Sequence, residues 1–274
     1  MATLFDTHHR VVPTWLAAST YLLQTDRREA RNLVLEIDDP MTRTDTDRLV
    51  IQKVDAAIRA RGALSVETVA GTIFPQGMYQ RYGRPDFYKK FLKMMERAKK
   101  PGTWGTYAMR LFARRAGAQQ INPMEIIIEK LKRAANEGNG YRAAYEAGLI
   151  DPVVDLDPAI DFGCELPTYD PGIDARKISN MPCLSHLSFK LVDHARVDLA
   201  AIYRSHYYCE RALGNLIGLS RLQAFVAREA GLAPGVLTCL STHARLDMRS
   251  WGGAAPTAAL IQQCNAALCA SLRI

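Results

Sequence analysis

The sequence predicts an α+β fold arranged as a single domain over residues 1–274. Helical and strand-like patterns alternate without regular order, and the strand-like segments concentrate in the C-terminal half, which favours α+β. Apolar residues make up 48% of the chain and charged residues 23%, an ordinary composition for a globular protein. A chain of 274 residues is also long enough to bury a large core.

Apolar periodicity predicts the helices, which we expect over residues 13–31, 45–61, 85–99, 123–133, 213–230 and 256–271. Glycines at 62 and 231 end two of them, and Pro123 occupies the first turn of another. The apolar run Val66–Ile73 fits a buried helix or a buried strand.

Strands are expected over residues 32–38, 184–192, 197–203 and 236–240. The second and third of these read as a pair joined by a turn at 193–196. Residues 102–111 read as a glycine-punctuated loop entering an element, and residues 150–180, rich in Pro, Asp and Gly, read as an irregular insertion.

The net charge of +7 indicates either an ordinary basic surface or an anionic ligand such as a phosphorylated small molecule. The basic clusters are scattered along helical stretches and interleaved with acids, so we expect no nucleic-acid polymer as a partner. No apolar run approaches the length of a membrane span, and the N-terminus lacks a secretory signal pattern. These features predict a cytoplasmic protein without a membrane partner.

The six cysteines contain no C-x-x-C pair and no Cys/His cluster with zinc-ligand spacing, so neither a metal site nor disulfides are expected. Most of them read as small core residues. A reactive cysteine has to be distinguished by its surroundings.

One cysteine does have distinctive neighbours in the sequence. Cys183 is followed 21 residues later by Arg204-Ser205 and then by Gly214-Asn215. A thiol can attack, a guanidinium can hold an anion and favour the thiolate, and a carboxamide can read a heterocycle. The alternatives are a buried structural cysteine and, for Asn215, the N-cap of a helix over residues 216–230.

Four collinear segments resemble the thymidylate synthase family, which includes the pyrimidine nucleotide hydroxymethylases. They are INPMEIIIEKLKR, TYDPGIDARKISNMPCLSHLSFKL, IYRSHYYCERALGN and AGLAPGVLTCLSTHARLD, within Ile121–Asp247. The resemblance implies a mixed sheet packed with helices and a homodimer formed through the sheet. It also implies one-carbon transfer from 5,10-methylenetetrahydrofolate to C5 of a pyrimidine nucleotide.

The resemblance assigns roles to five residues. Cys183 adds to C6 of the base, Arg204 with Ser205 binds the phosphate, and Asn215 orients the base. Glu67, 37 residues before Trp104-Gly105, takes the place of a half-buried proton-relaying glutamate. The alternative for Glu67 is a surface residue.

Four further residues are candidates for the nucleotide pocket. Tyr107 and Arg110 fit a Tyr-x-x-Arg pattern of hydroxymethylase-like relatives, with a packed aromatic and a surface arginine as the alternative. Arg245 and Asp247 stand where the family has its sugar ligands, with a surface ion pair as the alternative. Three nearby histidines are expected to be structural or at the pocket edge: His186, His206 and His243.

Several positions depart from the synthase pattern. Leu184 replaces a histidine, Tyr207 replaces an aspartate, and Phe162-Gly163 stand where tandem arginines are expected. The C-terminal region that closes over folate is expected to be missing or replaced. These departures favour a hydroxymethylase over two alternatives, a dUMP-specific thymidylate synthase and a catalytically silent nucleotide-binding relative.

Overall fold

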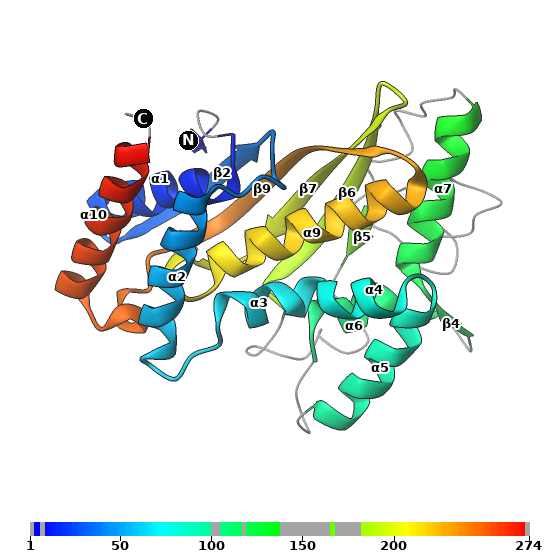
Figure 1. Ribbon diagram of the computed structural model, residues 1–274, viewed down its shortest axis with the longest axis horizontal. Coiled ribbons are helices and arrows are strands. Elements are labelled where there is room, and N and C mark those ends of the chain that lie inside the picture. The colour runs from blue at the N-terminus through cyan, green and yellow to red at the C-terminus, as the bar shows by residue number, and fades with distance from the viewer. Residues whose placement is uncertain are drawn as a thin grey trace. The chain divides into compact units, whose positions relative to one another are not determined.

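The computed structural model describes residues 3–5, 9–99, 105–116, 119–137, 165–167 and 182–271 (Figure 1). The predicted insertion at 150–180 lies outside them except for strand β5 (Glu165–Pro167), as do Trp104 and Phe162-Gly163. The chain divides into two compact units. Unit 1 comprises Met1–Ala70, Ile202–Ser220 and Val236–Ile274, and unit 2 comprises Gly71–Ala201 and Arg221–Gly235. The expectation of one domain stays a prediction.

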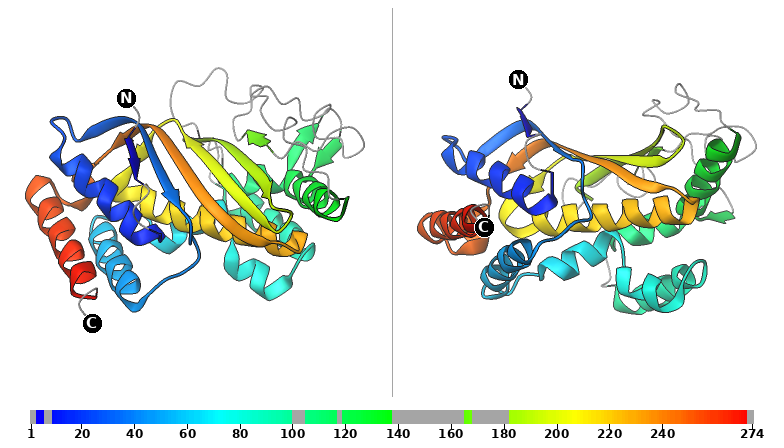
Figure 2. Two further views of the ribbon diagram at one scale, coloured as in Figure 1. Left: turned by 90° about the horizontal axis from the view of Figure 1, so that it is seen from above. Right: turned by 45° about the horizontal axis from the view of Figure 1, so that its top comes forward.

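Unit 1 contains a mixed sheet, which confirms the predicted α+β class. Strand β2 (Glu29–Ile37) pairs in parallel with β1 (Thr3–Phe5) and in antiparallel fashion with β9 (Ala233–Arg245). The two-residue strand β8 (His206–Tyr207) runs parallel to the end of β9. Figure 2 shows β2 and β9 side by side in both views.

Helix α1 (Val11–Gln24) packs on β2 in unit 1, and α2 (Asp45–Arg59) and α10 (Ala254–Ser271) pack against α1 and each other. Trp15 is fully buried at the centre of this packing. Its ring meets Trp251 edge-on at 6.1 Å between centroids, and its Nε1–H donates to the Tyr208 carbonyl at 3.0 Å. Trp251 belongs to the short helix η2 (Met248–Trp251).

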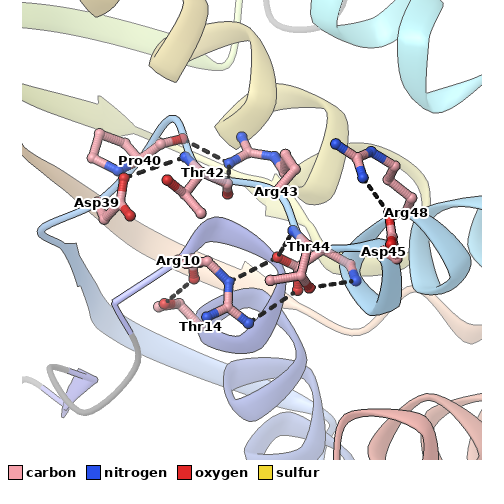
Figure 3. A network of polar contacts seen from close by, with 10 residues as sticks. Arg10, Thr14, Asp39, Pro40, Thr42, Arg43, Thr44, Asp45 and Arg48 are labelled. Atoms are coloured by element: carbon pink, nitrogen blue, oxygen red, sulfur yellow. Dashed lines mark hydrogen bonds and ion pairs between the residues drawn. The ribbon is translucent and has the colours of Figure 1, made fainter. Parts of the chain in front are cut away.

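The entry to α2 is fixed by a buried aspartate, whose partners Arg10 and Thr44 are labelled in Figure 3. Asp47 is fully buried, and Arg10 Nε donates to its Oδ2 at 2.8 Å. Asp47 also forms a capping box with Thr44, which satisfies two backbone N–H groups at the helix start. Beside it, Arg43 donates to the carbonyls of Pro40 and Thr42 and closes the loop between β2 and α2.

The first helix, α1, ends earlier than predicted. It ends at Gln24, where the Thr25 N–H and hydroxyl both bond the Leu22 carbonyl, and residues 29–31 begin β2 instead. The predicted strand at 236–240 was too short, since β9 continues to Arg245. Both differences have one cause. Glu29–Arg31 pair with His243–Arg245, and this pairing makes both segments part of the sheet.

The remaining predicted elements of unit 1 agree with the structure. The run at 66–73 is a helix, α3 (Val66–Ile73), and the helix at 213–230 is α9 (Leu213–Ala230). A π-helix, η1 (Tyr208–Ala212), leads directly into α9. Boundaries between the two units fall within α3, α9, β7 and β9.

Gly214 allows α3 and α9 to approach closely within unit 1. A Cβ added at Gly214 would lie 2.6 Å from Val69 Cβ and 2.8 Å from the Val66 carbonyl oxygen. Such distances do not occur between real atoms without a shift of the helices. Glycine at 214 is therefore a packing requirement, immediately before Asn215.

In the residues that the structure describes, unit 2 contains the predicted strand pair and several helices. Strands β6 (Leu184–Val192) and β7 (Arg196–Tyr203) flank a turn in which Asp193 and His194 have positive φ, and β5 pairs with β6. A two-stranded sheet forms from β3 (Arg114–Ala116) and β4 (Gln119–Ile121). The described helices that lie wholly in unit 2 are α4 (Gln76–Tyr82), α5 (Asp86–Ala98), α6 (Tyr107–Phe112) and α7 (Pro123–Glu137). The second half of α9 also belongs to unit 2.

The core of unit 2 is an aromatic cluster. Phe74, Phe87, Phe112 and Phe225 pack through ring contacts, with Phe74 stacked on Phe225 at 4.8 Å between centroids. Tyr79 meets three of these rings edge-on. Offset and edge-on ring packing of this kind stabilises a core beyond the area it buries.

Arg84 links three acidic side chains beside this cluster. Its side chain is 13% exposed and holds Glu125 in bidentate fashion, with both N–O distances at 2.7 Å. It also pairs with Glu129 at 2.6 Å and with Glu229 at 3.5 Å. Such a partly buried network is strongly destabilised when one partner is removed, because the remaining charges are left unpaired.

In the described ranges, no helix is both long and apolar enough to cross a membrane.

We expect Arg84→Ala to lower the free energy of unfolding by about 3 kcal/mol, because three carboxylates lose their common cation. The surface pair Arg133–Glu137 on α7 is the matched control, since Arg133 is 52% exposed. Arg133→Ala should cost no more than about 0.5 kcal/mol. Urea unfolding followed by circular dichroism measures both, and equal losses would contradict the assigned role of Arg84.

Gly214→Ala should destabilise the protein by about 1–3 kcal/mol, because the new methyl group overpacks the contact with α3. Gly71 in α3 provides the control, since a Cβ there meets nothing within 4 Å. Gly71→Ala should be stabilising by about 0.5–1 kcal/mol, the helix-propensity difference. Thermal melts of the two variants should move in opposite directions, and a rise in both melting temperatures would disprove the close approach.

Candidate functional site

In unit 1, the segment from Arg204 to Asn215 runs through β8, η1 and the start of α9. Arg204 and Ser205 are half-buried at the end of β7, while Tyr207 is 42% exposed. Thr242 on β9 donates its hydroxyl proton to the Arg204 carbonyl at 3.1 Å. This bond and the pairing of β8 with β9 fix the backbone that carries the predicted phosphate-binding pair.

Asn215 is buried inside α9, with 5% of its surface exposed. The N-cap alternative is wrong, because the helix already begins at Leu213 and follows η1 without a break. The amide Nδ2 of Asn215 hydrogen-bonds the ring nitrogen Nε2 of His206 at 3.2 Å. The side chain is thus held by a specific partner within the fold.

His206 is the partner that sequence reasoning missed. It is 1% exposed and stacks on the Tyr203 ring at 4.0 Å between centroids with an interplanar angle of 5°. Its Nδ1 bonds the Ser241 hydroxyl at 2.9 Å. Burial lowers the pKa of His206 to about 3, so its ring is neutral at physiological pH. The expectation of a structural histidine is confirmed, but its bond to Asn215 was not foreseen.

Asp247 uses both carboxylate oxygens within the fold of unit 1. Oδ1 accepts from the Cys209 backbone N–H at 2.8 Å, and Oδ2 accepts from the Ser250 hydroxyl at 2.7 Å. It therefore satisfies an N–H group in the first turn of η1. A role as a sugar ligand stays a prediction and would have to use the remaining lone pairs of the two oxygens.

Arg245 is exposed on β9 and pairs across the sheet with Glu29 on β2, at 3.4 Å from Nε to Oε1. His243 Nε2 lies 3.2 Å from the other oxygen of Glu29. The nearby His243 ring, more than the charge of Arg245, holds the pKa of Glu29 below its usual value. Arg245 thus forms an ion pair with Glu29 on the neighbouring strand. A role of Arg245 as a sugar ligand stays a prediction.

Glu67 lies in the first turn of α3 and is exposed. The half-buried environment that we expected for it is absent, because Val66 and Val69 occupy the buried face of this helix. Its catalytic role stays a prediction.

In unit 2, Cys183 is half-buried directly before β6, and its backbone is held by a tyrosine hydroxyl. The Tyr107 hydroxyl oxygen accepts from the Cys183 N–H at 3.1 Å and from the Leu184 N–H at 3.2 Å. Tyr107 is 7% exposed and opens α6, which Thr106 caps. Tyr107 thus fixes the position of the candidate nucleophile.

The exposure of the described cysteines singles out Cys183. Cys209, Cys239 and Cys264 are buried, and burial raises the pKa of each thiol, to about 12 for Cys239 and about 11 for Cys264. Such thiols remain protonated near neutral pH and do not act as nucleophiles. Cys269 is exposed on α10, which leaves Cys183 as the half-buried thiol among the described cysteines.

Two other candidates of unit 2, Arg110 at the end of α6 and His186 on β6, are half-buried. Among the described residues, no group of three or more His, Cys, Asp or Glu side chains is arranged to hold a metal ion.

No family model matches the chain. Over 84 residues the chain is 38% identical to a protein of Methanococcoides burtonii and 36% identical to one of Methanosarcina mazei. A Methanopyrus kandleri protein is 35% identical over 79 residues. All three are named "Putative thymidylate synthase".

These matches cover 31%, 31% and 29% of this chain. The chain spans 38%, 38% and 37% of the length of the three relatives. Over the matched segment, about a third of its length, the chain is therefore similar to three proteins that share one name.

Proposed function

We propose that this protein transfers a one-carbon unit to C5 of a pyrimidine nucleotide and produces the 5-hydroxymethyl derivative. The observation that carries the proposal is Cys183, a half-buried thiol whose backbone is fixed by Tyr107. The similarity to proteins named as thymidylate synthases supports it at the level of the family. We also propose that the active form is a homodimer, as the resemblance to the synthases implies.

In the proposed reaction, the Cys183 thiolate adds to C6 of the base and makes C5 nucleophilic. Methylenetetrahydrofolate would supply the one-carbon unit that C5 accepts. The C5 proton and tetrahydrofolate would then leave, water would add to the exocyclic methylene group, and Cys183 would leave C6. Arg204 would bind the phosphate, with Ser205, and favour the thiolate.

The choice of water rather than hydride as the final acceptor rests on the departures from the synthase pattern. Leu184 and Tyr207 replace polar residues of that pattern, and Asp247 already bonds Cys209 and Ser250. The second candidate is methylation of the nucleotide, which the name shared by the relatives favours. The two reactions differ in product mass.

The proposed role of Asn215 is to orient the base through its carboxamide. Its partner His206 is uncharged, because burial keeps the ring neutral at physiological pH. The Asn215 amide therefore has no charged group as its hydrogen-bond partner. An uncharged site of this kind suits an uncharged pyrimidine ring.

The first experiment incubates the protein with methylenetetrahydrofolate and UMP, dUMP, CMP or dCMP and measures product mass. We expect a gain of CH₂O on one nucleotide, whereas a gain of CH₂ would assign methylation. Cys183→Ala should abolish turnover, because the base can no longer be activated at C6. Cys269→Ala is the control and should retain full activity, since Cys269 is exposed on α10. Full turnover by Cys183→Ala would refute the mechanism.

Burial of His206 also predicts how stability depends on pH. The unfolded chain has a histidine pKa of about 6.5, and the folded value is about 3. At pH values between these two pKa values, the unfolded state binds more protons than the folded state. The free energy of unfolding therefore falls as the pH decreases below about 6.5. The slope from this group is at most about 1.4 kcal/mol per pH unit.

Urea unfolding between pH 7 and pH 5 measures this contribution. His206→Gln should lose it and show a shallower pH dependence than the parent protein. His194→Gln is the control, because His194 is exposed in the turn between β6 and β7. An unchanged slope in His206→Gln would show that folding does not lower the pKa of this ring.

A further inference from the structure

A continuous row of buried polar groups lies behind Asn215 in unit 1. Asn215 Nδ2 bonds His206 Nε2 at 3.2 Å, and His206 Nδ1 bonds Ser241 Oγ at 2.9 Å. The Tyr208 hydroxyl lies 3.5 Å from Ser241 Oγ. All four residues are at most 5% exposed.

The chemistry of the groups fixes the direction of each hydrogen bond. An amide nitrogen only donates, so the Nε2 atom of His206 must accept from Asn215. A neutral imidazole carries its single proton on the other nitrogen, which is Nδ1. This proton is therefore donated to Ser241 Oγ.

The reversed arrangement requires every bond to change together. If the Asn215 amide turned over, its oxygen would face the lone pair of Nε2. The ring proton would then have to move to Nε2, and the Ser241 hydroxyl would have to donate to Nδ1. The ring itself is held in place by its parallel stacking on Tyr203. The amide and the ring tautomer thus form one element with two states.

The two amide orientations match two different bases. Uracil presents an N3–H donor beside the O4 acceptor, whereas cytosine presents an N3 acceptor beside the N4 amino donor. An amide with its oxygen and nitrogen at fixed places pairs with one of these patterns and opposes the other. Opposed donors or acceptors carry a large penalty, because they remain unpaired in a buried site.

We propose that His206 is a positioning residue whose tautomer, set through Ser241, fixes the amide orientation of Asn215 and thereby selects the base. This inference rests on the proposed function, because it assumes that Asn215 reads a pyrimidine. In this proposal, His206 contributes to base specificity through its hydrogen bond to Asn215 and does not itself contact the base. Ser241 then influences base choice without touching the nucleotide.

The first measurement is independent of any substrate. Long-range proton–nitrogen NMR of histidine-labelled protein distinguishes the two tautomers of His206. We expect the Nδ1–H form in the parent protein and a mixture of both forms in Ser241→Ala. Ser19→Ala is the control, because Ser19 is fully buried but donates to the Trp15 carbonyl in α1. A mixture in the parent protein, or an unchanged Nδ1–H form in Ser241→Ala, would overturn the proposal.

The second measurement compares dissociation constants for UMP, dUMP, CMP and dCMP by calorimetry. The parent protein should prefer one base, and Ser241→Ala should reduce that preference about tenfold, the effect of one buried hydrogen bond. His206→Phe keeps an aromatic ring against Tyr203 but removes both bonds, so it should reduce the preference at least as much. His206→Gln should recover part of the preference, because its amide can still bond Asn215.

The outcomes separate this inference from the proposed function. An equal loss of affinity for both bases, with an unchanged ratio, would mean that His206 supports the core only and would overturn the inference. A locked tautomer without binding of any of the four nucleotides would refute the proposed function, and the inference with it. A preserved ratio in Ser19→Ala is required for the effect to be assigned to Ser241.

Discussion

The antiparallel ladder between β2 and β9 is the interaction on which the arrangement of unit 1 depends. At one end of this ladder, Glu29–Arg31 pair with His243–Arg245. The same end of β9 also pairs with β8. Because β8 carries His206, the ladder determines where the histidine lies, and through it the orientation of Asn215. The ladder also brings Ser241 to the other side of the ring. One edge of a sheet thus fixes the groups behind the candidate base-reading amide.

The same ladder explains which parts of the fold were predictable from sequence. Helices α2, α5, α7, α9 and α10 follow from local periodicity and end signals, and their bounds lie within a few residues of the predicted ones. Residues 29–31 contain helix-favouring Glu, Ala and Arg, so local propensity extended the first helix over them. Only their partners at 243–245, more than two hundred positions away, make them a strand. No local pattern contains that information.

The candidate site divides in a similar way. Cys183, Arg204 and Asn215 are recognisable because their residue types and spacing follow one chemical pattern. The residues that hold them are not, because Tyr107 lies 76 residues from Cys183 and Ser241 lies 35 residues from His206. A tyrosine in a helix and a serine in a strand are common, and their roles arise from contacts. The exposure of Glu67 is likewise a property of helix packing, since an apolar run alone does not tell which face is buried.

The close approach at Gly214 restricts how this protein can diverge during evolution. A smaller residue at position 69 would relieve only part of the crowding, since the carbonyl oxygen of Val66 belongs to the backbone and stays in place. Any side chain at 214 therefore requires α3 to move as a whole. Such a movement would carry Glu67 with it and disturb Asn215 at the adjacent position. Homologues that keep the same helix arrangement should conserve this glycine regardless of the nucleotide they bind.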